Sequence, residues 1–162
     1  MNDTPLSDVA EALGRIPSGL FVVTARNSEG IETAFLASWV MQAGFEPPAL
    51  SVAVGKDRPA LDFVREPGSV FTVSVIADTE KGQVGPFARG VAPAPEALAE
   101  LPVERTASGQ PVVQDCLAWM ECRTLSAAPS GDHEIVVAEI SGARGGREDA
   151  PAVHIRRNGL GY

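Results

Sequence analysis

The chain has 162 residues, of which 44% are hydrophobic and 21% charged, as is typical of a globular protein. Its 21 acidic and 13 basic residues give a formal charge of −8, which argues against binding to nucleic acid. No apolar run reaches the roughly 18 residues of a membrane span, and the N-terminal sequence MNDTPLSDVAEALG lacks the features of a secretory signal. These properties predict one domain over residues 1–162, no membrane partner and a cytoplasmic location.

The first predicted elements are a helix and a hairpin. Apolar residues recur at helical spacing over 6–16, and Ser7 or Asp8 is a suitable N-cap. Strand-forming residues at 20–26 and from 31 onward flank the turn sequence Asn-Ser-Glu-Gly. This arrangement predicts a β-hairpin.

Two further strands with a short helix between them are expected next. Two prolines precede the strand at 49–54, where they do not interrupt a ladder. Residues 57–65 predict a short helix with Asp57 as N-cap and Pro59 in its first turn. A strand at 69–77 follows.

The second half of the chain begins with an irregular excursion. Residues 78–110 contain four prolines and four glycines, and short helical turns are expected near 79–84 and 95–101. An excursion of this length is often a functional loop or an interface element. Three more strands are predicted near 117–125, 133–142 and 151–157. Six or seven strands with few helices indicate a mainly β, antiparallel barrel.

Two pairs of residues give no specific indication of function. Thr72 and Ser74 interrupt an apolar strand, so they either face solvent or line a polar pocket. Cys116 and Cys122 do not form a C-x-x-C pair, and we expect them to be reduced thiols packed as small apolar groups.

A candidate phosphate site follows the strand at 49–54. The chain has no G-x-G-x-x-G and no P-loop motif, which disfavours the folds that use them. Lys56 offers a point charge and Arg58 a planar fork, and the N-terminus of the following helix would add amide donors. The alternative is that both are solvated charges that pair with Asp57 or Asp62.

Other candidate residues lie at strand ends. Ala37 and Ser38 are small enough for a ligand to approach the backbone, whereas Trp39 suits either the core or a ligand platform. His133 begins a strand, where a histidine is usually structural. His133 and His154 have no metal-ligand spacing, so no metal is expected. No G-x-S-x-G elbow is present for a serine nucleophile.

Five motifs taken in order resemble one known family. They are RIPSGLFVVTA, LASWVMQAGFEPPALSVAVGKDRPA, GSVFTVSVI, GQPVVQDCLAWMECR and GDHEIVVAEI. The series resembles the flavin reductase-like family, whose fold is an FMN-binding split β-barrel, from about residue 10 to the C-terminus. LASWV, the KDR sequence and the final AVH…R…G…Y look most like the flavin reductase module of flavodiiron proteins.

The resemblance implies a homodimeric oxidoreductase that binds FMN, with FAD as the alternative flavin. It also implies that hydride passes from NADH or NADPH to flavin N5. It also implies a partner oxygenase or electron-transfer protein. It places Ala37, Ser38 and Trp39 along the isoalloxazine edge, Lys56 and Arg58 on the phosphate, and His133 where flavin and nicotinamide meet. The cofactor-binding residues carried over by this resemblance are Leu36, Ala37, Ser38, Trp39, Val54, Gly55, Lys56, Arg58 and Asp132. His133 is the candidate catalytic residue.

Two alternatives stay open at this point. One is an FMN-binding electron-transfer module without NAD(P)H activity of its own. The other is a split-barrel protein that binds a different ligand, such as haem. The visible spectrum of the purified protein distinguishes a flavin-binding chain from the latter.

Overall fold

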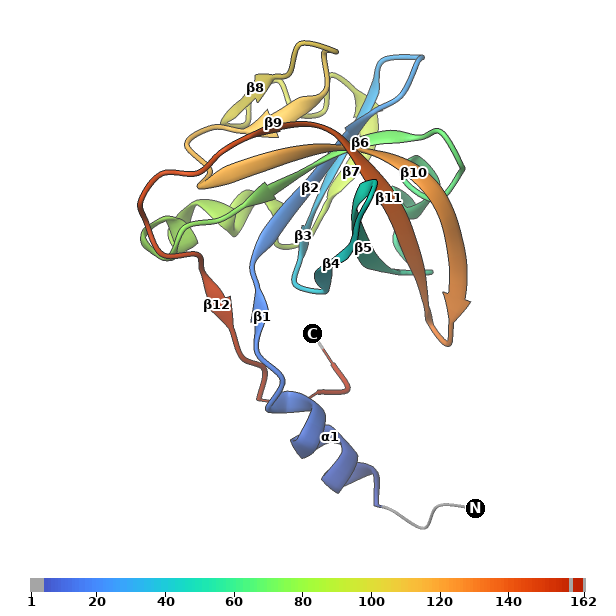
Figure 1. Ribbon diagram of the computed structural model, residues 1–162, viewed down its shortest axis with the longest axis vertical. Helices are drawn as coiled ribbons and strands as arrows, with labels where there is room; N and C mark the ends of the chain where they lie inside the picture. The colour runs from blue at the N-terminus through green and yellow to red at the C-terminus, as the bar shows by residue number, and fades with distance from the viewer. Residues whose placement is uncertain (1–4, 158, 162) are drawn as a thin grey trace.

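A curved antiparallel sheet forms the body of the protein (Figure 1). The computed structural model describes residues 5–157 and 159–161, and within them the sheet has eight strands. These are β2 (Phe21–Arg26), β3 (Ile31–Ala37), β4 (Val40–Phe45), β5 (Pro48–Gly55), β6 (Val70–Val75), β7 (Val91–Pro95), β10 (Ala118–Ser130) and β11 (His133–Arg144). Their order is β4-β5-β11-β10-β6-β2-β3-β7. The predicted mainly β, antiparallel fold class is confirmed.

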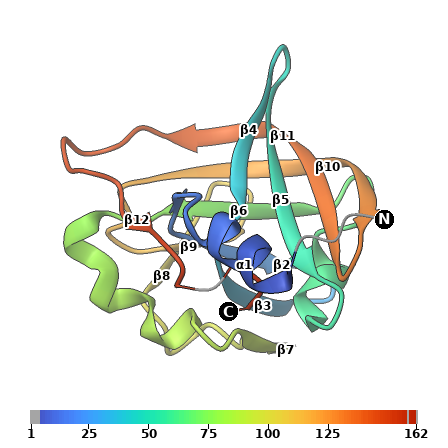
Figure 2. The same ribbon diagram turned by 90° about the horizontal axis from the view of Figure 1, so that it is seen from below.

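The two edge strands of this sheet are additional to the predicted ones. The side chains of β4 are mostly exposed, so its sequence lacks the apolar alternation of a half-buried strand. β7 contains Pro93 and Pro95, which a ladder tolerates at an edge. The β4–β5 hairpin projects away from the sheet (Figure 2), and Phe45 beside its turn is 87% exposed.

The last predicted strand is much shorter than expected. In place of 151–157, the structure has β12 (Val153–His154), which pairs with β1 (Ser18–Gly19). This small sheet leads the chain away from the barrel towards α1 (Leu6–Gly14), next to which the C-terminal segment also lies (Figure 1). The segment around Gly159 therefore lies against α1, where the Gly159 amide donates to the Ala10 carbonyl oxygen at 2.9 Å.

The helices begin at different residues from those predicted. α1 has Pro5 as its N-cap, and neither Ser7 nor Asp8 caps it, because the helix already includes both. The predicted helix at 57–65 is a 3₁₀-helix, η1 (Pro59–Phe63), whose N-cap is Arg58 rather than Asp57. A second 3₁₀-helix, η2 (Asp78–Phe87), covers the predicted turn near 79–84. Within the described residues, no helix combines the length and apolar character needed to cross a membrane.

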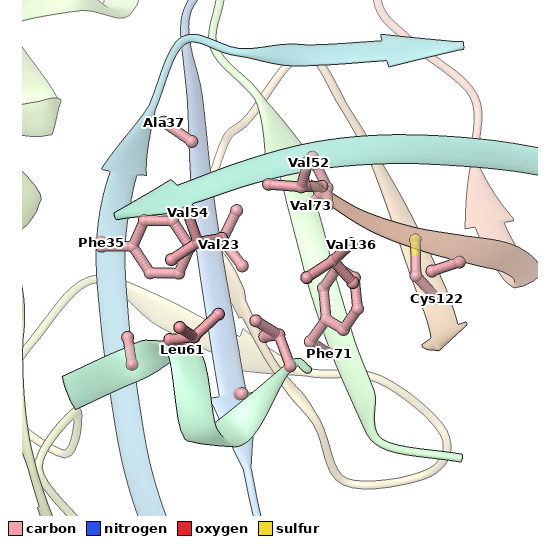
Figure 3. Packing of buried hydrophobic residues seen from close by; sticks show 14 of the residues in the cluster. Val23, Phe35, Ala37, Val52, Val54, Leu61, Phe71, Val73, Cys122 and Val136 are labelled. Atoms are coloured by element: carbon pink, nitrogen blue, oxygen red, sulfur yellow. The ribbon is translucent and has the colours of Figure 1, made fainter. Parts of the chain in front are cut away.

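Apolar side chains form two clusters, one on each side of the sheet. The first lies between the strands of the curved sheet, where Phe35 and Phe71 pack together with Leu61 of η1 (Figure 3). The second includes Phe87 and Leu98 from the excursion, both with no exposed surface. The central strands are therefore buried on both faces, which explains their nearly continuous apolar sequences.

The excursion is a packed layer rather than an open loop. It contains η2, β7 and β8 (Val103–Arg105), and β8 pairs with β9 (Pro111–Val113), which directly follows the excursion. Glu32, only 1% exposed, joins this layer to the sheet. Its carboxylate pairs with Arg105 and with Arg26 at 3.6 Å, and it accepts a hydrogen bond from the Leu98 amide at 3.3 Å.

Thr72 and Ser74 neither face solvent nor line an open pocket, so both sequence-based alternatives are wrong. Both side chains are fully buried beneath β9. The hydroxyls of Thr24 and Thr72 donate to the Pro111 carbonyl oxygen at 2.6 and 2.5 Å. Ser74 Oγ accepts from the Val113 amide at 3.2 Å. The polar pattern of this strand therefore serves to dock the excursion, because buried hydroxyls need partners.

The two cysteines are free, buried thiols, as predicted. They belong to different apolar clusters, Cys122 to the first and Cys116 to the second. Burial raises the pKa of both thiols, that of Cys122 to about 12.

Candidate functional site

A cavity of about 550 Å³ opens beside the end of β3, within the size range of small-ligand sites. Its wall is built from three regions of the chain: the β2–β3 hairpin, the segment around Arg58 with Ala88, and the C-terminal segment 154–161. The described residues that line it are Leu20, Leu36, Ala37, Ser38, Arg58, Ala88, His154, Ile155, Arg156, Arg157 and Gly161. No acidic side chain is among them.

The sequence-predicted residues at the end of β3 reach this cavity. β3 ends at Ala37 because the chain turns at Ser38 and Trp39 to enter β4. Leu36, Ala37 and Ser38 line the cavity, and with Arg58 they also line a narrow recess next to it. Trp39 and Val54 lie on the wall of that recess. The small side chains at 37 and 38 leave backbone within reach of a ligand.

Arg58 and Lys56, predicted to act together, lie in different places. Arg58 lines both the cavity and the recess. The Lys56 ammonium donates to the Gly131 carbonyl oxygen at 2.7 Å, and Lys56 is not among the lining residues. Of the carboxylates suggested as alternative partners, Asp62 pairs with Arg65 at 3.7 Å. Only Arg58 of the two cations therefore presents charge to the cavity.

The amide donors expected from a helix N-terminus are not available here. η1 begins with Pro59, which has no N–H group. The Arg58 amide already donates to the Gly55 carbonyl oxygen at 3.1 Å, and the Leu61 amide donates to the Arg58 carbonyl oxygen at 3.0 Å. Anion binding at this corner therefore depends on side chains.

His133 is held in place by its neighbours at the start of β11. A two-residue turn precedes it, in which Gly131 has a φ of 60°, a conformation that favours glycine. His133 Nδ1 is hydrogen-bonded to Asp132 Oδ1 at 2.7 Å, and this bond lowers the pKa of the Asp132 carboxyl. The imidazole ring lies 4.9 Å from the Trp39 ring, centroid to centroid. His133 is buried and contacts the recess through Trp39.

Gly55 faces His133 across the β5–β11 ladder. A Cβ atom at this position would lie 2.7 Å from Asp57 Oδ1 and 3.9 Å from His133 Nε2. A larger residue at 55 would therefore require the exposed Asp57 side chain to move, whereas the distance to His133 is an ordinary van der Waals contact. Gly55 and Asp132 support the site without lining it.

The residue that the sequence analysis missed is Arg156. Its Nη2 donates a hydrogen bond to Ser38 Oγ, and its guanidinium lies 4.5 Å from the Trp39 ring centroid. The C-terminal segment that carries it is anchored to α1, because the Gly159 amide donates to the Ala10 carbonyl oxygen at 2.9 Å. The available signal was a pair of adjacent arginines in a chain with an excess of acidic residues.

Comparison with known proteins identifies the family. Residues 13–159 match the model described as the flavin reductase like domain, so the chain belongs to this family. Diflavin flavoprotein A 1 of Synechocystis sp. is 35% identical over 161 residues, which are 96% of this chain and 27% of the relative. A Nostoc sp. homologue is 38% identical over 160 residues, or 98% of this chain and 28% of its own length. The chain thus corresponds to one part of these longer proteins.

Solved structures share the fold. NADH:FAD oxidoreductase SgcE6 of Streptomyces globisporus C-1027 superposes with a TM-score of 0.77 at 23% identity, covering 91% of this chain and 82% of that one. BorF, the flavin reductase component of a bacterial two-component tryptophan halogenase, has a TM-score of 0.74 at 24% identity and covers 90% of both chains. These similarities establish the architecture shared with the flavin reductases.

Proposed function

We propose that this chain is an FMN-binding flavin reductase that uses NADH or NADPH as electron donor. The observation that carries the proposal is the cavity beside Ser38 and Arg58, in a chain of the flavin reductase-like family. A bound flavin would supply the redox chemistry by accepting hydride at N5. The rest of the catalytic task, binding and orientation, belongs to the protein.

The residues present suit a flavin phosphate and ring. Leu36 and Ala37 give an apolar wall for the isoalloxazine, and Ser38 adds a hydroxyl at the same edge. Arg58 offers a guanidinium for bidentate binding of the phosphate. FAD has the same ring and ribityl phosphate, so these contacts would serve either flavin.

His133 has a positioning role in this proposal. It touches Trp39 and Asp132 rather than the cavity. Because the hydrogen bond fixes the orientation of the imidazole, His133 holds Trp39 against the recess. A Trp39 held in this way limits how a flavin ring can tilt in the site.

Anaerobic mixing of the purified protein with FMN and either NADH or NADPH tests the proposal. We expect the protein to turn yellow with FMN and the flavin absorbance to bleach on addition of at least one donor. A colourless preparation that FMN does not turn yellow would overturn flavin binding, and would favour a different ligand such as haem.

A second candidate is a flavin-binding electron-transfer module without NAD(P)H activity of its own. The observation in its favour is that the chain matches only 27–28% of the length of its diflavin flavoprotein relatives, so in those proteins the matching part is joined to a longer chain. FMN binding without bleaching by either donor would support this candidate. Bleaching of the flavin absorbance by a reduced electron-transfer protein would then identify the chain as an electron-transfer module.

Homodimerisation is part of the same proposal. Apolar side chains are exposed on α1, just after it and on the C-terminal segment: Leu6 is 74% exposed, Ile16 63% and Ile155 63%. A second copy is the occupant that the family resemblance implies, and residues 1–162 would form one domain of that dimer. Light scattering on the purified chain tests this point, and a monomeric mass at micromolar concentration would contradict it.

A partner oxygenase or electron-transfer protein would receive the electrons from the reduced flavin.

A further inference from the structure

The C-terminal segment forms a large part of the cavity wall. Five of the eleven described lining residues come from it, namely His154, Ile155, Arg156, Arg157 and Gly161. The segment reaches the cavity through the β1–β12 pairing and its contact with α1.

The cavity has a charge opposite to that of the whole protein. The formal net charge of the chain is −8, yet Arg58, Arg156 and Arg157 line one cavity that has no acidic side chain among its described lining residues. Guanidinium groups stay charged at any physiological pH. Such a local reversal of sign concentrates anionic ligands in the cavity.

One flavin phosphate does not require three guanidinium groups. Under the proposed function, Arg58 binds that phosphate from the β5–η1 turn. Arg156 and Arg157 belong to the opposite end of the sequence and add two further charges. A nicotinamide dinucleotide carries two phosphates in its pyrophosphate, and NADPH carries a third.

The positive charge of Arg156 lies next to the residues at which the flavin edge is proposed. Its guanidinium contacts Ser38 Oγ and lies 4.5 Å from the Trp39 ring centroid, and Trp39 packs on His133. Arg157 is the exposed neighbour of Arg156 on the same wall. A dinucleotide whose phosphates are bound by this pair would have its nicotinamide close to the flavin edge proposed at residues 36–39.

We propose that Arg156 and Arg157 bind the phosphate groups of the dinucleotide electron donor. A donor that carries phosphates is therefore used in preference to one that has none. This inference rests on the proposed function, since it assumes that flavin occupies the Ser38 and Arg58 side of the cavity. It assigns donor recognition to the C-terminal segment and flavin phosphate recognition to Arg58.

The test compares donors with and without phosphates in wild type and in the variant Arg156→Gln/Arg157→Gln. NADH and NADPH carry phosphates, whereas 1-benzyl-1,4-dihydronicotinamide has the same reacting ring and none. We expect kcat/KM for the better dinucleotide to fall at least about tenfold, in line with loss of charge-assisted hydrogen bonds. The controls are read in Arg157→Gln, which leaves the contacts of Arg156 with Ser38 and Trp39 intact: the value for the benzyl donor and the FMN affinity should each stay within about twofold.

Calorimetric titration of ADP-ribose into the FMN-loaded protein gives a readout that does not depend on turnover. Binding should weaken at least about tenfold in the double variant and remain unchanged in Arg123→Gln, a half-exposed arginine on β10. Each single variant, Arg156→Gln and Arg157→Gln, keeps the test informative if the double variant does not fold.

Three outcomes would overturn the inference while leaving flavin binding intact. They are equal losses with both kinds of donor, a loss of FMN affinity without loss of ADP-ribose affinity, and no ADP-ribose binding by wild-type protein that binds FMN. Failure of the wild-type protein to bind FMN would instead contradict the proposed function itself.

Discussion

The guanidinium of Arg156 lies 4.5 Å from the centre of the Trp39 ring, and the same side chain donates a hydrogen bond to Ser38. Residues 118 positions apart in the sequence thus form one corner of the cavity. The Trp39 ring also packs against His133, with 4.9 Å between the ring centroids. Trp39 is therefore held by two side chains from the C-terminal part of the chain, although it is 40% exposed.

Replacement of Trp39 should weaken flavin binding in a graded way. Trp39→Phe keeps an aromatic ring against His133 but weakens the cation–π contact, so we expect the Kd for FMN to rise about two- to fivefold. Trp39→Ala removes the ring and should cost more. Fluorescence titration with FMN measures both effects. Trp119→Phe is the matched control, and wild-type affinity in Trp39→Ala would show that this ring does not contribute.

Arg58 and Lys56 should differ sharply in their effect on flavin phosphate binding. Arg58→Gln is expected to raise the Kd for FMN about ten- to hundredfold, because it removes a charge-assisted hydrogen bond to the phosphate. Lys56→Gln should have a small effect, since the Lys56 ammonium is bonded to the Gly131 carbonyl oxygen. Riboflavin, which lacks the phosphate, provides the control ligand. If Arg58→Gln weakened riboflavin and FMN equally, the phosphate assignment would be wrong.

Phe87 in the excursion should be essential for stability. The side chain is completely buried, and Phe87→Ala is expected to lower the free energy of unfolding by about 3–5 kcal/mol. Phe45→Ala makes the same chemical change at an 87% exposed position and should alter stability by no more than about 0.5 kcal/mol. Urea unfolding followed by circular dichroism measures both. Similar values for the two variants would mean that the excursion does not belong to the core.

The two thiols should be unreactive in the folded protein at neutral pH. Burial raises the pKa of Cys122 from 9.0 to about 12, so its thiolate fraction is very small. Alkylation with iodoacetamide should therefore be slow until urea unfolds the chain. Rapid alkylation of Cys122 in the folded state would contradict this account of its environment.

The same raised pKa predicts the direction of a pH effect on stability. Between pH 9.0 and about 12, the unfolded thiol of Cys122 loses its proton while the folded thiol keeps it. The unfolded state then binds fewer protons, so the free energy of unfolding decreases as pH rises through this interval. This contribution is fully present below pH 9.0. Unfolding curves of wild type and Cys122→Ala over this range measure it, and a shallower decline is expected in the variant.

The central strands were predictable because their two faces are both buried. β2, β5, β6 and β11 have long apolar sequences between clear turn residues, and these patterns are strong signals. The edge strand β4 gives no such signal, since most of its side chains are exposed. Its pairing depends on β5 being present beside it, which is a tertiary effect.

The site was predictable only in part. Ser38 and Arg58 lie next to recognisable strand ends, and the family resemblance pointed to both. Arg156 reaches Ser38 because the chain passes through β12 and turns past α1, and no local pattern reports such a path. For Lys56 the sequence suggested more than the structure shows. Its position two residues from Arg58 suggested that both bind the phosphate, but the Lys56 ammonium is bonded to the Gly131 carbonyl oxygen instead.

The buried carboxylate of Glu32 makes the excursion and the barrel a single cooperative unit. It joins Arg26 of β2, the Leu98 amide and Arg105 of β8 at one point with almost no access to water. The excursion cannot separate from the sheet without leaving a charge in apolar surroundings or rehydrating all of these groups together. The buried, hydrogen-bonded amides of this layer, those of Leu98 and Val113, should therefore exchange with solvent together, at a rate close to that of the central strands.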